Sequence, residues 1–313
     1  MIKEEFYFDS RDGENRIHAV RYTPDDGNVR GIVQIVHGMA EYVERYENLA
    51  EFLTKRGILV TGEDHLGHGK SVSEGGSFGY FCEQDPATVV VRDVHRLKKI
   101  TEEQYPQVPY IILGHSMGSF IARNYLCRYG SGIGGAVIVG TGMQSAGLIF
   151  ASKAMAGIQK LFCGSKHVSH FIDKAAFGGY NKRIDSPRTS SDWLSRNTEN
   201  VDRYIEDELC GFTFTVNGFQ TLFELIRRLQ KQENLEKVPQ NLPILMVSGA
   251  EDPVGDYGKG VHKACDSLKR AGVKNITVKL YENDRHELLN EDDAEVAMED
   301  IWQWICKEIP GIA

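Results

Sequence analysis

Residues 110–118, Tyr-Ile-Ile-Leu-Gly-His-Ser-Met-Gly, decide the fold of this chain. The apolar run at 110–113 predicts a buried strand, and the stretch from 116 to 129 predicts a helix. The turn between them has the pattern G-x-S-x-G, in which a serine is presented on a sharp strand-to-helix turn. Because this turn leaves no room for side chains two residues before and after the serine, both positions need glycine. Gly114 and Gly118 meet that need.

Strands and helices alternate on both sides of this turn. Near-continuous apolar runs predict strands buried on both faces, as in a parallel sheet. The predicted strands are 5–8, 16–22, 31–36, 58–61, 110–113, 135–139, 243–248 and 276–281. The predicted core helices are 46–56, 86–105, 116–129, 259–271 and 292–309. This alternation predicts an α/β fold with a mostly parallel sheet and a hairpin at the N-terminus.

One interval interrupts the alternation. The 102 residues from Thr141 to Leu242 exceed the roughly 30 residues that one strand-to-strand crossover needs. The surplus holds two predicted helices, 148–162 and 218–230, with an aromatic and polar stretch between them. We therefore divide the chain into a first core segment, a helical cap insertion and a second core segment, with the bounds 1–142, 143–230 and 231–313.

The composition restricts the class of protein. The chain has 313 residues, 41% of them hydrophobic, and a formal net charge of −8. Phosphate binding needs clustered Lys and Arg, so the acidic balance argues against a nucleic-acid partner. Six scattered cysteines without C-x-x-C spacing argue against a zinc site or a disulfide framework. We expect no transmembrane segment, because no run of about 18 apolar residues occurs. We expect a cytoplasmic location, because the N-terminus lacks an apolar signal core.

A serine hydroxyl is a weak nucleophile near neutral pH, so Ser116 needs a base and an acid that orients the base. In this type of fold they follow in the order Ser, acid, His, on loops just past strand ends. Asp252 and His286 each follow a predicted strand near the C-terminus. We predict that His286 takes the proton from Ser116 and that Asp252 holds its imidazole. Two further residues are alternatives for the acid, Glu251 and Asp256.

An oxyanion hole completes the predicted catalytic groups. One backbone N–H comes from Met117, the residue after the nucleophile, and the second from the loop after the third strand. That loop is Val36-His-Gly-Met-Ala40, in which Gly38 lets the backbone turn toward the serine and Met39 is the expected donor. We interpret His37 as a residue that orders this loop.

Together these pieces resemble the α/β-hydrolase superfamily, and within it the monoacylglycerol lipase and lysophospholipase group of serine hydrolases. The resemblance rests on residues 37–46, on Asp64-His-Leu-Gly-His-Gly-Lys-Ser71 and on the glycine–serine motif. Asp252 and His286 complete it in the expected order. The resemblance covers most of the core and is weak across the insertion. It implies an eight-stranded, mostly parallel sheet with helices on both faces and a helical cap between strands six and seven.

The resemblance also implies an activity. Members of this group hydrolyse esters of single acyl chains, such as monoacylglycerols or lysophospholipids, and need no metal or organic cofactor. We therefore expect a small, lipid-like ester as substrate and an acyl-enzyme on Ser116. The same core hosts small-substrate carboxylesterases and serine aminopeptidases, which are the alternatives. An aminopeptidase needs acidic cap residues facing its pocket, and the candidates are Glu199, Asp202, Glu206, Asp207 and Glu208.

The predicted helix at 148–162 is also a candidate for membrane contact. Its apolar face either packs on the core or forms an acyl-chain tunnel or a membrane-facing surface. The net charge of −8 disfavours general attraction to anionic membranes. We therefore expect any peripheral membrane contact to come from the apolar surface of the cap.

Overall fold

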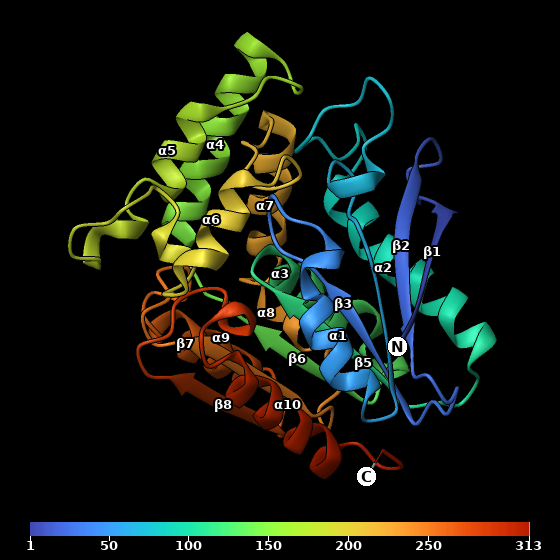
Figure 1. Ribbon diagram of the computed structural model, residues 1–313. Coiled ribbons are helices and arrows are strands. Elements are labelled where there is room, and N and C mark those ends of the chain that lie inside the picture. The colour runs from blue at the N-terminus through green and yellow to red at the C-terminus, as the bar shows by residue number, and fades with distance from the viewer. Residues whose placement is uncertain (313) are drawn as a thin grey trace.

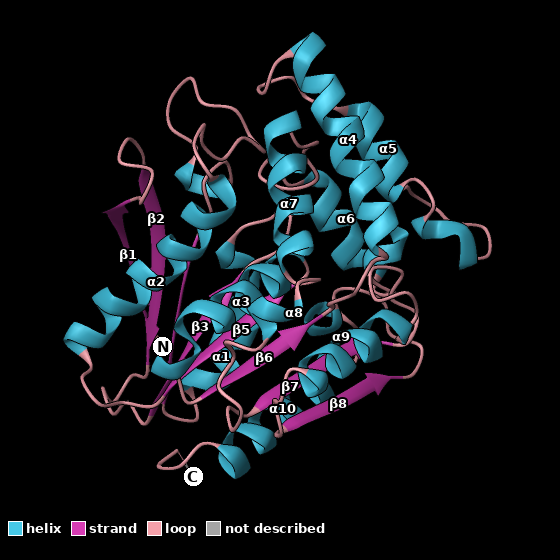
Figure 2. Cartoon of the chain, turned by 180° about the vertical axis from the view of Figure 1, so that it is seen from behind, coloured by secondary structure: helices cyan, strands magenta, loops and turns pink. Residues whose placement is uncertain are grey.

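A computed structural model of the chain describes residues 1–312 and contains one sheet of eight strands with helices on both faces (Figure 1, Figure 2). The strand order across the sheet is β1-β2-β4-β3-β5-β6-β7-β8. β2 pairs antiparallel with β1 and β4, and every other pair is parallel. The strands are β1 (Ile2–Asp9), β2 (Arg16–Thr23), β3 (Gly31–Val36), β4 (Ile58–Glu63), β5 (Tyr110–His115), β6 (Gly135–Val139), β7 (Ile244–Gly249) and β8 (Ile276–Tyr281). The prediction of a mostly parallel α/β sheet is confirmed.

Two hydrophobic layers enclose this sheet. The helices α1 (Glu47–Thr54) and α10 (Ala294–Glu308) pack on one face. The helices α2 (Pro86–Gln104), α3 (Met117–Tyr129) and α9 (Lys259–Arg270) pack on the other face. Every residue of β3 to β7 is buried, which is why their sequences are near-continuous apolar runs.

Between β6 and β7 the chain leaves the sheet and forms the helical cap. Its helices are α4 (Ala146–Cys163), α5 (His170–Phe177), α6 (Thr198–Glu206) and α7 (Val216–Arg228), and a short helix, α8 (Gln232–Leu235), follows before β7. α4 packs along α7, and both views show α4 and α5 at the outer edge of the molecule. The prediction of a helical cap between strands six and seven is confirmed, whereas its boundaries at 143 and 230 stay predictions.

The cap contains two helices that the sequence pattern does not predict. The predicted helices 148–162 and 218–230 correspond to α4 and α7. α5 and α6 have only 8 and 9 residues, too few for a helical period to stand out. Each begins at a capping side chain: Ser169 accepts from the Ile172 N–H, and Asn197 accepts from the Asn200 N–H. These two N-caps are the local signal for both helices.

Two general properties of the chain follow from the described residues. Within residues 1–312, no helix has the length and apolar character needed to cross a bilayer. All six cysteines carry free thiols. The cytoplasmic location stays a prediction.

The packing around Gly118, in the turn between β5 and α3, can be tested by substitution. A Cβ added to Gly118 would lie 1.9 Å from the carbonyl oxygen of Val36. We expect Gly118→Ala to lower the free energy of unfolding by about 3 kcal/mol or more, because β3 and α3 would have to separate. Gly157→Ala is the control, since its added Cβ meets no atom within 4 Å. Within α4 that alanine should raise stability by about 0.5–1 kcal/mol. Urea unfolding measures the free energy of unfolding of both variants. Equal stabilities of Gly118→Ala and Gly157→Ala would contradict the packing argument.

Candidate active site

Ser116 occupies a strained backbone position between β5 and α3. Its φ is +54° and its ψ is −121°, which residues other than glycine rarely adopt and which costs about 1–3 kcal/mol. Its N–H donates to the Val139 carbonyl at 3.1 Å, which ties the turn to β6. Cβ atoms added to Gly114 and Gly118 would lie 2.5 Å and 1.9 Å from backbone carbonyl oxygens. The tight packing around these two glycines therefore maintains the strained turn.

The structure brings Ser116, Asp252 and His286 together. The distance from His286 Nε2 to Ser116 Oγ is 2.7 Å, and that from His286 Nδ1 to Asp252 Oδ2 is 3.0 Å. Asp252 is buried and also accepts from the Ser248 hydroxyl and the Val254 N–H. In this geometry the imidazole is placed to receive the serine proton while the carboxylate fixes the ring.

The two alternative acids lie on the same loop as Asp252 and have a different environment. Glu251 and Asp256 are both exposed. In the part of the chain that the structure describes, neither is hydrogen bonded to His286. An orienting carboxylate has to contact the imidazole, so the geometry favours Asp252 over both.

The loop after β3 passes directly beside the serine. A Cβ added to Gly38 would lie 3.0 Å from Ser116 Cβ, so this close approach requires glycine. Met39 and Met117 line the same cavity as Ser116. Among residues 1–312, neither of these two methionines donates its N–H to another group. Two free N–H groups beside a serine hydroxyl suit the stabilisation of an oxyanion.

Three buried histidines support this loop. Burial lowers the pKa of His37, His65 and His68, to about 3 for His68, so all three are neutral near pH 7. His37 orders the loop as expected: its Nε2 accepts from the His65 N–H at 3.0 Å, and its Nδ1 contacts the Gly38 carbonyl at 2.8 Å. Throughout the described residues, no three His, Cys, Asp or Glu side chains are placed to share a metal ion.

A buried ion-pair network joins the loop after β3 to the loop that carries His286. Glu41 accepts from the Gly38 N–H at 2.5 Å and from Arg45 at 2.8 Å. Arg45 also binds both carboxylate oxygens of Glu287, at 2.7 Å and 2.8 Å. Burial alone would raise the pKa of Glu41 and Glu287, but the charge and hydrogen bonds of their partners outweigh it, so both pKa values lie below the ordinary value. The two loops are therefore held together by charge.

Two residues connect this network to the rest of the site. His115 donates from Nε2 to the His286 carbonyl at 3.1 Å, and its Nδ1 lies 2.8 Å from the Tyr46 hydroxyl. Burial lowers the pKa of His115, but the hydrogen bond and charge of Glu41 raise it above the ordinary value. From the cap, Asn200 donates to Glu287 at 2.6 Å. No local pattern in the sequence indicates the role of Glu287, because 242 residues separate it from Arg45.

A cavity of about 900 Å³ lies between the core and the cap and contains Ser116 and His286. Its apolar walls come from the core loops, α3, α4 and α7, and include Met39, Phe120, Leu148, Ile149, Leu222, Phe223 and Ile226. The ring of Trp193 lies beside that of His286, with the two ring centroids 5.1 Å apart. Polar and charged side chains also line the cavity, among them Glu41, Gln144, Asp173, Lys174, Ser191, Asp256 and Lys263. The site is therefore a chamber with apolar walls on the side of α3, α4 and α7, polar groups elsewhere, and Ser116 in its wall.

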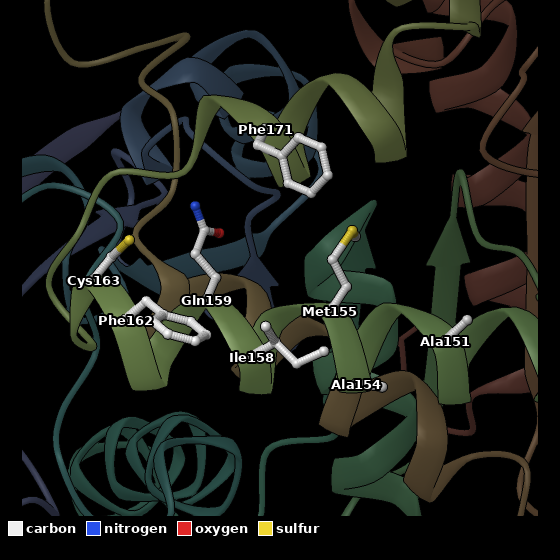
Figure 3. Close-up of a pocket in the computed structure, with 8 residues that line it drawn as sticks. All are labelled: Ala151, Ala154, Met155, Ile158, Gln159, Phe162, Cys163 and Phe171. Atoms are coloured by element: carbon white, nitrogen blue, oxygen red, sulfur yellow. The ribbon is translucent and has the colours of Figure 1, made fainter.

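A second, smaller cavity of about 650 Å³ lies on α4 and α5. Figure 3 shows Met155, Ile158 and Phe162 along α4, with Phe171 of α5 across from them. Ala151 and Met155 line both this groove and the larger cavity. The apolar groove on the cap and the chamber that holds Ser116 therefore share part of a wall, formed by α4.

Known proteins are similar to this chain in both sequence and fold. The chain is 29% identical to monoglyceride lipase of Rattus norvegicus over 87% of this chain and 80% of that protein. It is 27% identical to monoacylglycerol lipase of Mycolicibacterium smegmatis over 92% of each chain. The crystal structure of a thermostable carboxyl esterase from Bacillus coagulans, in complex with glycerol, is 31% identical and superposes with a TM-score of 0.91 over 100% of both chains.

The fold and these similarities define an α/β-hydrolase that acts on esters. Residues 27–293 match the family described as serine aminopeptidase, S33. The chain belongs to this family, and within it resembles the monoacylglycerol lipases.

The ion-pair network predicts unequal effects of its members on stability. Arg45→Met leaves two buried carboxylates without their cation, so we expect the free energy of unfolding to fall by about 3–5 kcal/mol. Glu287→Gln leaves Arg45 paired with Glu41 and should cost only about 1–2 kcal/mol. Lys55→Met is the control, because its pair with Glu51 is solvent-exposed and should leave stability unchanged. Urea unfolding measures all three, and equal losses for Arg45→Met and Glu287→Gln would refute a shared cation.

Proposed function

We propose that this enzyme hydrolyses esters of single acyl chains, monoacylglycerols or lysophospholipids, through an acyl-enzyme on Ser116. The observation that carries the proposal is the chamber of about 900 Å³, which has Ser116 in its wall and a large apolar surface from α3, α4 and α7. An acyl chain buries apolar surface along such walls, and the polar groups of the chamber are available to a small head group. The relatives named as monoglyceride and monoacylglycerol lipases support the same substrate class.

In the proposed reaction His286 accepts the Ser116 proton as the serine oxygen attacks the ester carbonyl. Asp252 keeps the imidazole in the required tautomer and stabilises its cation. The N–H groups of Met39 and Met117 bind the carbonyl oxygen as it becomes negative. His286 then returns the proton to the departing alcohol, and water activated by the same histidine releases the fatty acid.

The cap residues weighed for an aminopeptidase do not line the cavity, whereas another acidic cap residue, Asp173 on α5, does. None of the five acidic cap residues weighed for amine binding, Glu199, Asp202, Glu206, Asp207 and Glu208, is among the residues that line it. Two of them have structural contacts instead: Asp202 pairs with Arg188, and Asp207 accepts from the Tyr42 hydroxyl at 2.8 Å. A small-substrate carboxylesterase uses the same catalytic groups, so acyl-chain preference is the deciding property.

Covalent labelling and a substrate series test the proposed reaction. We expect a fluorophosphonate to form one adduct on Ser116, found by peptide mass spectrometry, and Ser116→Ala to abolish labelling and lower kcat by at least about 10⁴-fold. Among p-nitrophenyl esters from acetate to palmitate, kcat/KM should be highest for the long chains. Highest activity on acetate would instead identify a small-substrate esterase, and highest activity on aminoacyl-naphthylamides an aminopeptidase. Ser267→Ala, on α9, is the matched control and should label normally.

We also propose that the outer surface of α4 and α5 contacts lipid surfaces from which the substrate is taken. Phe150, Leu161, Phe162 and Phe171 are 77%, 84%, 84% and 65% exposed. The groove between these helices shares the wall residues Ala151 and Met155 with the chamber that contains Ser116. Although the net charge of the chain is −8, residues 146–174 contain four lysines and one acidic residue. Apolar side chains flanked by lysines suit the surface of an anionic bilayer.

Vesicle co-sedimentation tests this contact. The protein should bind vesicles of phosphatidylcholine and phosphatidylglycerol, and Leu161→Ser with Phe162→Ser should weaken binding by at least about tenfold, because two exposed apolar side chains are lost. Val296→Ser is the matched control, since Val296 is an exposed apolar residue on α10, far from the cap in sequence. Unchanged binding of the cap variant would disprove the contact, and its activity on soluble p-nitrophenyl esters should remain normal.

A further inference from the structure

Arg123 is a buried cation that the proposed reaction does not use. It lies on α3, seven residues after Ser116, and its side chain is only 1% exposed. Its guanidinium donates to the Thr141 hydroxyl at 3.2 Å and the Gly142 carbonyl at 3.0 Å, and it approaches Met143 Sδ at 3.7 Å. All of these partners are neutral, and no carboxylate of residues 1–312 lies within 4.0 Å of its nitrogens.

Other buried cations of this chain differ from Arg123 in having acidic partners. Arg45 binds two glutamates, and Lys98, which is 2% exposed, pairs with Glu102 at 2.9 Å. Burial lowers the pKa of Arg123 to about 10, so it is still charged at neutral pH. Burying an unpaired charge is strongly unfavourable. No ion pair offsets this cost, so a buried unpaired cation on the helix that follows Ser116 is a candidate for a role in the reaction.

Hydrogen bonds lead from Arg123 back to the nucleophile. The Thr141 hydroxyl, which Arg123 contacts, is hydrogen bonded to the Ser119 hydroxyl at 2.8 Å. Ser119 in turn donates to the Ser116 carbonyl at 2.5 Å. Each hydroxyl both donates and accepts, so the four groups form a continuous polar chain beside the first turn of α3. Positive charge at one end polarises that chain.

The loop that Arg123 holds is packed between the loops of the other two candidate catalytic residues. A Cβ added to Gly140 would lie 3.1 Å from His286 Cε1. A Cβ added to Gly142 would lie 2.3 Å from the Val254 carbonyl, two residues beyond Asp252. The loop is closely packed on both sides, so a change in its position is transmitted to His286 and Asp252.

We propose, on the basis of the proposed esterase function, that Arg123 is a positioning residue for the reaction and supplies positive potential to it. Its guanidinium holds the loop at residues 140–143 against His286. Side chains on a helix point toward its N-terminus, which brings the charge toward the end of α3 where the substrate oxygen becomes negative. Seven residues span about 10 Å of helix, a distance over which a charge acts in a water-poor interior. The positive charge of Arg123 therefore gains a negative counterpart only during turnover, when the substrate oxygen becomes negative.

Arg123→Met tests the proposal, because methionine fills a similar volume without charge. Replacing a buried charge with an apolar side chain is often neutral or stabilising, so the melting temperature should stay the same or rise. We expect kcat per fluorophosphonate-titrated site to fall about tenfold, with KM within about twofold of the original value. Arg123→Lys, which keeps the charge, should restore most of kcat. Lys98→Met is the matched control: it removes a buried cation that pairs with Glu102, and should lower the melting temperature without changing kcat.

Thr141→Val supplies a second test that does not depend on the folding of Arg123→Met. It keeps the shape of residue 141 and removes the hydroxyl between Arg123 and Ser119, so kcat should fall about threefold with KM unchanged. Normal kcat in either variant would overturn the proposal. A loss of activity that only reflects fewer fluorophosphonate-labelled sites, with kcat per site unchanged, would overturn it too. Failure of the esterase proposal is distinguishable, because it would appear as absent labelling of Ser116 in the unmodified protein.

Discussion

The close approach of β3, β5 and α3 around Ser116 is the constraint on which the rest of the structure depends. Gly118 faces the Val36 carbonyl, and the serine itself has a φ of +54°. That geometry is possible only because two glycines leave space and because the parallel strands are held rigidly between helical layers. With the turn fixed, the loop after β3 passes the serine on one side and the β8 loop reaches it with His286 on another. The scaffold therefore stores local strain and uses its core packing to maintain it.

Charge is distributed around this turn in two different ways. Glu41 and Glu287 share the positive charge of Arg45 and so join two loops, which is a structural use of buried charge. Arg123 has only neutral partners and lies behind the same turn. The first arrangement holds the catalytic loops in place. The second leaves positive potential in the interior, where the proposed reaction generates a negative oxygen.

The core was predictable because its signals are local. Apolar runs locate the strands, and the spacing of Gly114, Ser116 and Gly118 locates the turn. The helices α5 and α6 were missed because each spans few turns and is stabilised by its caps and contacts more than by a strong periodic pattern. Glu287 and Asn200 were missed because their contacts join residues far apart in the chain. The insertion was predicted from its length and from two helical patterns, and neither says how its helices pack.

By itself, the sequence determined the α/β class, the position of the strained serine and the order of the candidate acid and base. Each of these depends on residues that are neighbours in the chain. Only the tertiary structure decided that Asp252 contacts His286 while Glu251 and Asp256 face solvent. It alone revealed a chamber that shares a wall with an apolar groove on the cap, and a buried arginine on α3 without an acidic partner. Cavities and unpaired charges are defined by which distant residues meet, and packing in three dimensions decides that.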